Sequence, residues 1–492
     1  MPVNLNILLA SAEVFPLAKT GGLADVCASL PSALEAFGAE ARILMPAYRG
    51  VTSMITAKPV GRPFRPLIGA DSVRLLKGTL PGSRIPVYLI QCSELYDRPG
   101  TPYTDQYGID HPDNAIRFGI LSKVAAMFGT REGLDGWRAD VVHGHDWHCG
   151  LASAYLKFGD RSTAASVFTI HNLAFQGNFD RKVRRSLGID SLAFHMDGLE
   201  YYGHLSFMKS GIFYSDAVTT VSPTYAREIQ ASTHGCGMDG VLRHRSERLC
   251  GILNGIDTRE WDPATDRRLP ATYSPDDMDG KSTCRAALMK AKGLDASSEG
   301  LLVGMLGRMT AQKGWPLLLD AAPALLDSGM NIILMGSGNP KYEEAIRQLK
   351  ARYPDRVGHQ AGFDEDFAHL LIAGADVLAV PSVFEPCGLV QMYAQRYGTL
   401  PVAHRTGGLA DSITDLSDGR SGSPTGFLFE APSTADLVQA MKRAQRLRVE
   451  QAAEWDRLCA NGMRRDFSWG SSARRYAEVY QAALDIRRQG PK

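Results

Sequence analysis

Short apolar runs rich in Val and Ile recur along the chain, and each is followed by turn residues and an amphipathic stretch with helical spacing. These features predict strands at 6–10, 41–45, 87–90, 141–143, 167–170, 218–221, 302–306, 332–335, 377–380 and 400–403. The amphipathic stretches between them predict helices at 114–128, 315–326, 341–352 and 436–448. Such alternation is typical of an α/β protein whose parallel sheets are covered by helices.

The chain has 492 residues, which is too long for one ordinary domain, so we expect two lobes. The boundary is expected near 254–262, where turn residues flank Trp261. The polar, Pro- and Asp-rich segment 257–283 then reads as a connector into the second lobe. We therefore expect one domain over residues 1–253 and another over 254–470.

Composition excludes several classes of partner. Lys and Arg number 54 against 53 Asp and Glu, which leaves no basic surface for nucleic acid or an anionic membrane. The N-terminal apolar run has no basic lead, and no run is long enough to span a bilayer. None of the eight cysteines forms a CxxC pair, so reduced thiols and a cytoplasmic location are expected.

One heptapeptide occurs almost unchanged in both halves, as KTGGLAD at 19–25 and RTGGLAD at 405–411. Each copy follows a predicted strand and precedes a helical stretch. Paired glycines let the backbone approach a ligand, and a helix N-terminus favours an anion. The repeat suggests two related sheets facing a cleft, and the alternative is an ordinary tight turn in each half.

Two loops after predicted strands of the second half carry candidate chemistry. In GRMTAQKG, Arg308 and Lys313 flank a short turn where both cations can reach a diphosphate. In EPCGL, Glu385 lies at the carboxyl end of a strand, where open α/β sheets bind ligands. The alternatives are two surface cations and a carboxylate that caps a helix.

The first half carries HGHDWH at 143–148 and His171, again at strand ends. Asp146 is expected to hydrogen-bond a sugar and Trp147 to stack on it, although each can equally be a structural group. The histidine spacing does not give a helical ligand face, and the acidic trio 364–366 reads as a helix start. No metal site is expected.

In their order and spacing, the motifs KTGGLADV, LYDRPG, HDWH, FTIHNLAFQG, VSPTYA, NGID, GRMTAQKG, EPCGL and RTGGLAD resemble those of bacterial glycogen synthases, relatives of plant starch synthases. The resemblance spans Ile7 to about Tyr480. It implies the GT-B fold, two Rossmann-like domains with parallel sheets facing a deep interdomain cleft, with the C-terminal helix in 471–492 packed on the first. It implies retaining transfer of glucose from ADP-glucose to the nonreducing 4-hydroxyl of an α-1,4-glucan, with neither metal nor cofactor.

The resemblance also implies roles for individual residues. Arg308 and Lys313 would hold the diphosphate, and Glu385 would bind the glucose hydroxyls and His171 contact the glucose. The remaining contacts to substrate would come from Lys19, Gly21, Gly22, Asp25, Tyr96, Asp146, Trp147, Asn254, Phe363, Cys387, Gly388 and Leu389. Among these, Phe363 would stack on adenine. Of the whole set, Glu385, His171, Lys19, Arg308 and Lys313 would be catalytic.

Some positions depart from the family pattern. Val383 stands where Arg is common, Val390 where Thr is common, and the loop 233–240 also differs. Sucrose and mannosyl transferases of the same fold commonly carry a second Glu eight residues after the first, where this chain has Tyr393. A catalytically silent glucan-binding protein is a rival from another class, and the donor's base and the oligomeric state stay open.

Since no second carboxylate is placed as a nucleophile, we expect displacement on one face of the sugar through an oxocarbenium-like state. Arg308 and Lys313 would stabilise the leaving diphosphate, one of whose oxygens would take the acceptor's proton. Closure of the lobes would exclude water, because hydrolysis competes with transfer.

Overall fold

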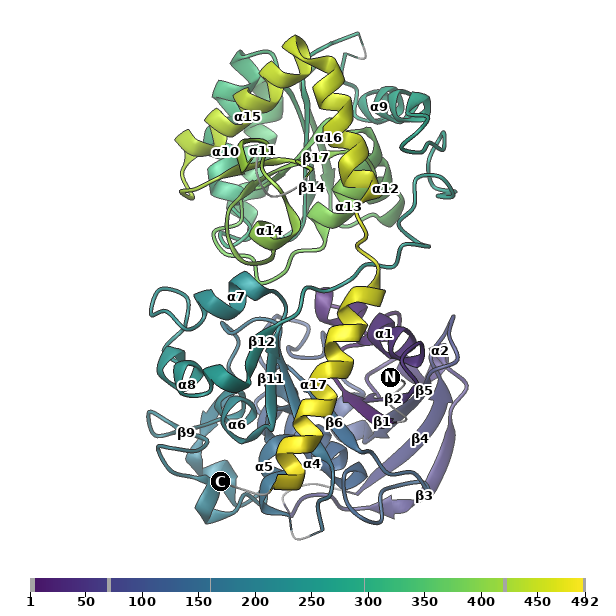
Figure 1. The fold of residues 1–492 in the computed structure, drawn as a ribbon, viewed down its shortest axis with the longest axis vertical. Coiled ribbons are helices and arrows are strands. Elements are labelled where there is room, and N and C mark those ends of the chain that lie inside the picture. The colour runs from purple at the N-terminus through teal and green to yellow at the C-terminus, as the bar shows by residue number, and fades with distance from the viewer. Residues whose placement is uncertain (1–4, 69–71, 160, 296, 419–422, 490–492) are drawn as a thin grey trace. The chain divides into compact units, whose positions relative to one another are not determined.

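The structure is a computed structural model that describes residues 5–68, 72–159, 161–295, 297–418 and 423–489. The chain divides into two compact units, unit 1 (Met1–Gly255 with Trp469–Lys492) and unit 2 (Ile256–Ser468) (Figure 1). The chain passes from unit 1 to unit 2 between residues 255 and 256 and returns between residues 468 and 469. The boundaries expected from the sequence lie between residues 253 and 254 and between residues 470 and 471. Within the described ranges, no helix is long and apolar enough to cross a membrane.

Unit 1 is built on a nine-stranded sheet. In spatial order its strands are β12 (Leu249–Gly251), β11 (Ala217–Thr220), β7 (Ala165–Ile170), β6 (Val141–His145), β1 (Leu5–Ala10), β2 (Ala39–Pro46), β5 (Pro86–Gln91), β4 (Val73–Thr79) and β3 (Lys58–Phe64). The first seven run parallel, while β4 and β3 form an antiparallel edge. A separate small sheet contains β8 (Asn178–Asp180), β10 (His204–Ser206) and β9 (Glu200–Tyr201).

Strand β1 shows why this sheet is covered on both faces. Its side chains alternate between two cores: Leu8 and Ala10 join one, and Ile7 and Leu9 join the other. All four are essentially inaccessible to solvent. Because successive residues of a strand point to opposite faces, a continuous apolar run requires helices on both sides.

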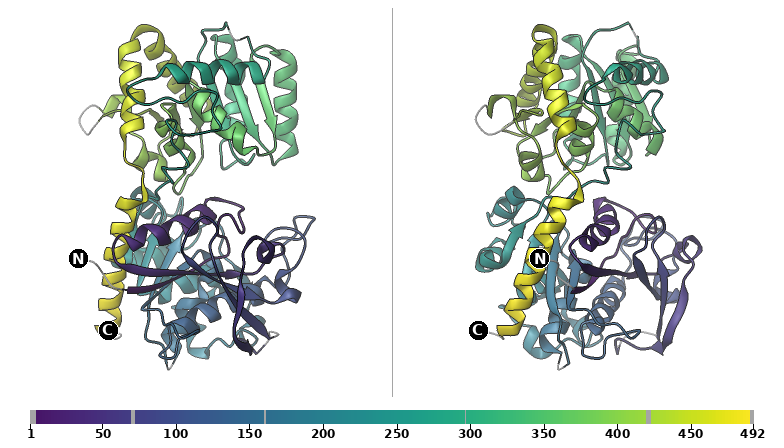
Figure 2. Two further views of the ribbon diagram at one scale, coloured as in Figure 1. Left: turned by 90° about the vertical axis from the view of Figure 1, so that its right-hand side faces the viewer. Right: turned by 45° about the vertical axis from the view of Figure 1, so that its right-hand side comes forward.

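The helices of unit 1 supply those two layers. They are α1 (Gly22–Glu35), α2 (Val51–Met54), α3 (Ser93–Tyr96), α4 (Asn114–Phe128), α5 (Leu151–Phe158), α6 (Phe207–Tyr214), α7 (Pro223–Glu228), α8 (Asp239–His244) and α17 (Trp469–Gln489). Helix α17 buries Trp469, Tyr476 and Tyr480 in the core with Ile7 and Leu9. Figures 1 and 2 show this helix, in yellow, running along unit 1, so the chain's end completes the first unit.

Unit 2 contains a six-stranded, fully parallel sheet. Its spatial order is β15 (Val357–Ala361), β14 (Asn331–Gly336), β13 (Leu302–Leu306), β16 (Val377–Val380), β17 (Leu400–His404) and β18 (Phe427–Phe429). Its helices are α9 (Asp279–Ala291), α10 (Trp315–Asp327), α11 (Pro340–Arg352), α12 (Glu365–Gly374), α13 (Val390–Arg396), α14 (Gly407–Ser412), α15 (Thr434–Glu450) and α16 (Ala452–Arg464). Val303 and Met305 face the α10 and α15 side, whereas Leu302 faces α9 and α12.

In each sheet the parallel strands follow one another outwards from a central strand, first on one side of it and then on the other. The order of the strands therefore reverses at one point. In unit 1 the reversal lies between β1 and β6, and in unit 2 between β13 and β16. Connections diverge at such a point, which leaves a crevice at the carboxyl ends of the two strands where α/β proteins bind ligands. The loops after β1, β6, β13 and β16 are therefore where the topology places a site.

All ten predicted strands and all four predicted helices are present. The strands that the sequence pattern missed are the antiparallel pair β3 and β4, the small sheet, and the short strands β12, β15 and β18. Charged or polar residues interrupt the apolar sequence of β3, β4 and β15, and the other strands have only two or three residues, so all of them lack the signal that identifies a buried strand. The segment 257–283 belongs to unit 2 and contains no regular element before α9.

Candidate active site

The loop after β1 carries Lys19 to the start of α1 in unit 1. A buried carboxylate, Glu13, holds this loop: it accepts hydrogen bonds from the backbone N–H and hydroxyl of Thr20, from the Gly21 N–H at 3.1 Å, and from the Tyr103 hydroxyl. Glu13 is only 3% exposed. Glu13 is not among the residues predicted from the sequence, although an acid three residues after a buried strand is a usable signal.

Replacing Glu13 by glutamine should lower kcat/KM by roughly tenfold to a hundredfold, because the amide cannot accept all of these hydrogen bonds and the Lys19 loop loses its fixed position. The matched control is Glu35→Gln, an exposed acid at the end of α1. Initial rates with glucan and nucleotide sugar would measure both variants. Equal rates for the two, at equal thermal stability, would show that Glu13 does not position the loop.

Lys19 and Asp25 face each other at the start of α1. The Lys19 ammonium lies 2.8 Å from the Asp25 carboxylate, and 40% of the lysine side chain is exposed. An Ala-sized side chain at Gly21 would meet no atom within 4 Å, so the backbone beside Lys19 is open. The structure thus brings Lys19, Gly21, Gly22 and Asp25 together at one end of the sheet, beside the reversal of strand order.

Asp146 follows β6 and lies on the other side of that reversal. It is buried and has a positive φ of 56°, a conformation that non-glycine residues seldom adopt. Its Oδ1 accepts hydrogen bonds from the backbone N–H groups of His171 at 2.8 Å and Asn172 at 3.3 Å. Asp146 therefore holds the loop after β7 through Oδ1, and its predicted hydrogen bond to a sugar stays a prediction.

Burial raises the pKa of Asp146 to about 7, against the two backbone hydrogen bonds, which lower it. The folded state then binds this proton more tightly than the unfolded state, so the group's contribution to stability falls as pH rises from about 4 to about 7. Asn cannot titrate. As the pH rises from 5 to 8, we expect the free energy of unfolding of Asp146→Asn to rise by roughly 3 kcal/mol relative to that of the parent.

Guanidinium unfolding of both proteins at pH 5, 6, 7 and 8 measures this difference. A stability difference that stays constant over the four pH values would contradict the titration of Asp146.

His171 follows β7, next to the Asp146 loop. Its Nε2 lies 3.0 Å from the Nδ1 of His145, and burial lowers the pKa of His171 to about 3. His143, also buried, contacts Tyr480 of α17 and Thr169. At neutral pH His171 is uncharged, so it can exchange hydrogen bonds with sugar hydroxyls but brings no positive charge to the site.

Two predicted aromatic contacts, Tyr96 and Trp147, pack against other side chains of unit 1, and their roles as sugar contacts stay predictions. Tyr96 is 1% exposed, and its hydroxyl donates to the Arg117 carbonyl at 2.6 Å, so the side chain packs in the core of unit 1. Trp147 packs among Phe118, His148, Phe179 and Phe207. A Cβ at Gly177 would lie 2.2 Å from its ring, so one face of the indole is covered by backbone and cannot stack on a sugar.

Asn254 lies at the end of unit 1, directly after β12. It is 6% exposed, and its Oδ1 has no hydrogen-bond partner in the part of the chain that the structure describes. A buried amide oxygen without a partner costs free energy, which is tolerated most easily where a ligand or water supplies the donor. Asn254 therefore remains a candidate contact.

In unit 2, Lys313 and Glu385 meet beside the second reversal of strand order. The Lys313 ammonium lies 2.6 Å from Glu385 Oε2, and the Ser382 hydroxyl donates to the same oxygen at 2.9 Å. Glu385 is 5% exposed, whereas the Lys313 side chain is 28% exposed. The pair joins the loop after β13 to the loop after β16, and the Val383 N–H also donates to the Gln312 carbonyl at 2.8 Å.

Arg308 is exposed at the start of the same loop after β13. No side-chain partner of Arg308 is found among the described residues, while its carbonyl accepts a hydrogen bond from the Trp315 indole at 3.0 Å. The backbone is thus anchored and the guanidinium extends into solvent. The loop after β13 therefore presents the exposed guanidinium of Arg308 and the partly exposed ammonium of Lys313, two cations that can bind a diphosphate.

The second heptapeptide acts differently from the first. Arg405 pairs with Asp418 and Glu430, so it is not a second Lys19. Gly407 has φ +43°, and a Cβ there would lie 2.0 Å from the Glu385 carbonyl oxygen. The Gly408 N–H donates to that carbonyl at 3.0 Å. The paired glycines of this copy let α14 approach and hold the Glu385 loop.

The remaining predicted residues of unit 2 lie around this loop. Cys387 is buried, and Gly388 and Leu389 lead into the first turn of α13, which starts at the departure Val390. Phe363, between β15 and α12, is 71% exposed, so its ring is open to stacking. The acidic trio begins α12 as expected, since Asp364 accepts from the Phe367 N–H at 3.0 Å.

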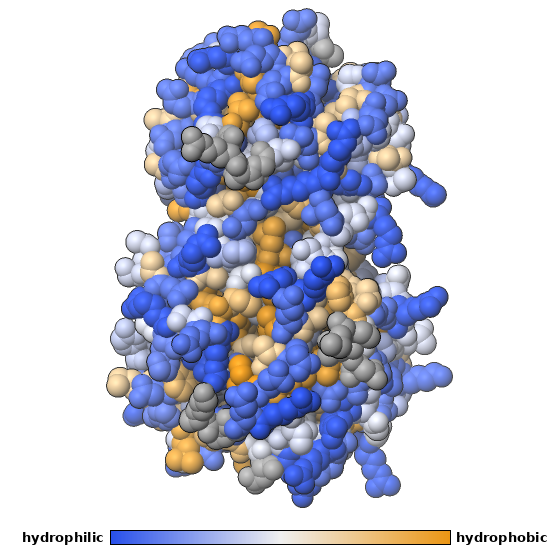
Figure 3. All heavy atoms as spheres, viewed as in Figure 1, coloured by the Kyte–Doolittle hydropathy of each residue, from blue (hydrophilic) through white to orange (hydrophobic). Residues whose placement is uncertain are grey.

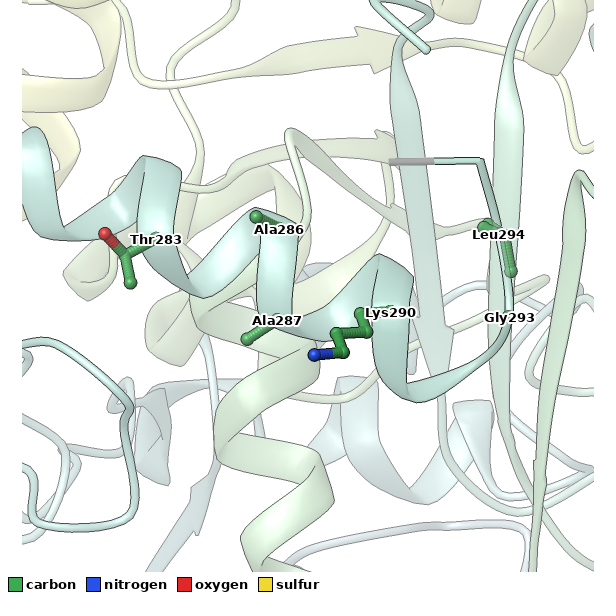
Figure 4. A pocket seen from close by; sticks show the side chains of 6 residues that line it. All are labelled: Thr283, Ala286, Ala287, Lys290, Gly293 and Leu294. Carbon is green, nitrogen blue, oxygen red and sulfur yellow. The ribbon is translucent and has the colours of Figure 1, made fainter. Parts of the chain in front are cut away.

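A surface hollow elsewhere in unit 2 does not contain any of these residues. It has a volume of about 560 Å³ and is lined by Thr283, Ala286, Ala287 and Lys290 of α9 and by Gly293 and Leu294 just after that helix (Figure 4). It offers one ammonium and one hydroxyl among apolar side chains. On the face shown in Figure 3, hydrophilic residues make up most of the surface of each unit. Neither feature competes with the loops at the strand ends as a site.

Comparison with known proteins extends over nearly the whole chain. Residues 6–244 match the starch synthase catalytic domain, and residues 290–457 match the glycosyl transferases group 1 family. Glycogen synthases of Aromatoleum aromaticum and Thioalkalivibrio sulfidiphilus are 48% and 47% identical, each over 97% of this chain and over 97% and 99% of their own lengths.

Among solved structures, the catalytic domain of starch synthase IV from Arabidopsis thaliana, bound to ADP and acarbose, has 32% identity and a TM-score of 0.87. The match covers 98% of this chain and 100% of that one. A sucrose-phosphate synthase from Thermosynechococcus elongatus, at 19% identity and a TM-score of 0.60, shares the fold alone. The chain therefore belongs to the glycogen synthase family of glycosyltransferases and has the GT-B fold.

Proposed function

We propose that the enzyme transfers glucose from ADP-glucose to the nonreducing 4-hydroxyl of an α-1,4-glucan with retention of configuration. The observation that carries this proposal is the Lys313–Glu385 pair, 2.6 Å apart, in the loops that flank the strand-order reversal of unit 2. A cation for the leaving group and a carboxylate for sugar hydroxyls lie side by side there. Such an arrangement suits a glucosyl diphosphate, which carries both chemistries on adjoining atoms.

The difficult step is cleavage of the bond between C1 of glucose and the diphosphate oxygen, because negative charge develops on the leaving group. Arg308 and Lys313 would stabilise that charge. Glu385 would hold the glucose hydroxyls so that C1 is correctly oriented. A departing phosphate oxygen would accept the acceptor's proton, so that the new bond forms on the face from which the diphosphate leaves.

The exposed ring of Phe363 is proposed to stack on adenine. In unit 1, Lys19 and the Gly21–Gly22 backbone would face phosphate, and uncharged His171 would contact glucose. Asp25 and Asn254 would complete the polar lining, and Asp146 would position the His171 loop. Cys387, Gly388 and Leu389 would offer backbone groups beside Glu385.

The donor is tested by incubating the purified enzyme with glycogen and either labelled ADP-glucose or labelled UDP-glucose. We expect glucan labelling at least tenfold faster from ADP-glucose, and α-linked product only. Faster labelling from UDP-glucose would overturn the choice of donor. Labelling from neither, with glycogen still bound, would favour a silent glucan-binding protein.

The Phe363→Ala variant should raise the KM for ADP-glucose, because one base–aromatic stack is lost.

A further inference from the structure

A second cluster of ligand-type side chains lies in unit 2, away from the Lys313–Glu385 pair. Glu260, Glu365 and His369 each offer one ligand atom, and these atoms all lie within 4.8 Å of one another. Glu260 is exposed, Glu365 is half-buried and His369 is fully buried. Glu365 and His369 are four residues apart on α12, which places both side chains on one face of the helix.

The imidazole of His369 is fixed in a way that leaves one nitrogen available. Its Nδ1 lies 2.7 Å from Asp266 Oδ2, and the Tyr397 hydroxyl donates to the same oxygen at 2.8 Å. The Arg268 N–H donates to the other carboxylate oxygen at 3.0 Å, so Asp266 is the acceptor of all three bonds. Nδ1 then carries the hydrogen, and Nε2 carries the lone pair that binds metals.

The orphaned nitrogen is the observation that points to a ligand. His369 Nε2 is buried and has no hydrogen-bond partner among the described residues. The ring cannot turn away, because Trp261 stacks on it at 3.9 Å and Trp261 itself stacks on Tyr393 at 3.8 Å. A buried acceptor held in one orientation and left unsatisfied costs free energy unless something binds it.

We propose that Glu260, Glu365 and His369 form a binding site for a divalent cation of the zinc type, with water as the fourth ligand. One imidazole nitrogen and two carboxylate oxygens are a donor set that Zn²⁺ accepts, and a carboxylate behind the ligating histidine is a recurrent partner in such sites. The glutamates would close the remaining distance by side-chain rotation. This site lies outside the proposed catalytic machinery.

The charges around the cluster favour weak metal binding, so the occupancy of the site would depend on the metal concentration. Arg268 now pairs with Glu260 at 2.8 Å and with Asp366 at 3.2 Å, so the cation would compete with one guanidinium for Glu260. Bound metal would link Glu260, near the start of unit 2, to Glu365 in the first turn of α12, two residues beyond Phe363. Metal would therefore stabilise the part of unit 2 that carries the proposed adenine contact.

The test uses untagged, full-length protein in a Cys236→Ser background, because that thiol is exposed and can bind zinc. Zn²⁺ is titrated against a chromophoric chelator, and thermal melting is recorded with and without zinc. We expect one Zn²⁺ per chain, a rise in melting temperature with zinc, and much weaker binding of Mg²⁺. Glu260→Gln and Glu365→Gln should each weaken zinc binding at least tenfold and remove the thermal shift.

Asp366→Asn is the matched control. It removes the same charge from the same helical turn and also loses a contact to Arg268, but Asp366 is not one of the three ligands. We expect less than a threefold change in zinc affinity. Zinc binding that both glutamate variants leave unchanged, or that Asp366→Asn weakens as much as they do, would overturn the site. His369→Gln is a further variant, and the two glutamate variants decide the outcome if it does not fold.

Discussion

Glu385→Ala should lower kcat by about 10³-fold while the protein stays folded, because the carboxylate proposed to hold the glucose hydroxyls is removed from the reacting centre. The exposed acid Glu344 on α11 supplies the control, and Glu344→Ala should keep the parent's rate. Radiolabel transfer into glycogen at saturating donor measures both. Near-parent turnover in the Glu385 variant would refute its catalytic role.

The fold of this variant should be largely preserved. Glu385 is nearly buried, so removing its charge also removes the cost of desolvating it, while Lys313 keeps access to water. A small change in melting temperature is therefore expected. Comparison with Glu385→Gln separates charge from shape: both variants should be slow if the carboxylate itself binds sugar, whereas recovery with glutamine would mean that hydrogen bonding alone suffices.

Lys313→Ala should raise the KM for the donor by about tenfold to a hundredfold and lower kcat by about 10², because one cation for the diphosphate is lost both before and during bond cleavage. Lys290→Ala, an exposed lysine on α9, is the matched control. Steady-state kinetics with varied nucleotide sugar would measure the two constants. Unchanged donor KM and kcat would refute the assignment.

A double variant distinguishes phosphate binding from mere support of Glu385. In a Glu385→Ala background the Lys313–Glu385 contact no longer exists, so any further effect of Lys313→Ala must come from another partner. We expect this second change to weaken ADP binding at least tenfold in calorimetry. The same ADP affinity with and without Lys313 in that background would reduce Lys313 to a positioning residue.

The alternation of apolar runs and helical spacing predicted ten strands, and the structure contains all ten, because each has a largely buried and uninterrupted apolar run. The antiparallel strands were harder to predict. Strand β4 pairs with β3 and β5, and the charged Arg74 and Lys77 interrupt its apolar sequence. Strands β12 and β18 have three residues each, too few to show a period, and β15 contains the polar His359 and Gln360.

Local motifs located the loops of the candidate site but did not predict what each side chain does there. HDWH ends a strand as expected, yet Trp147 turns into an aromatic cluster and Asp146 turns towards backbone N–H groups. Tyr96 lies in a motif and is buried all the same. A motif shows which residues occur near a site, whereas side-chain direction depends on packing with residues from other segments.

The sequence by itself determined the α/β class, the two halves, the candidate loops and the resemblance to glycogen synthases, because these follow from periodicity and from contiguous motifs. Only the tertiary structure showed that Glu13 holds the Lys19 loop and that Gly407 supports the Glu385 loop. It alone brought Glu260 to His369, 109 positions later in the chain. Contacts of this kind depend on strand order, since side chains distant in sequence meet only where the sheet places their loops side by side.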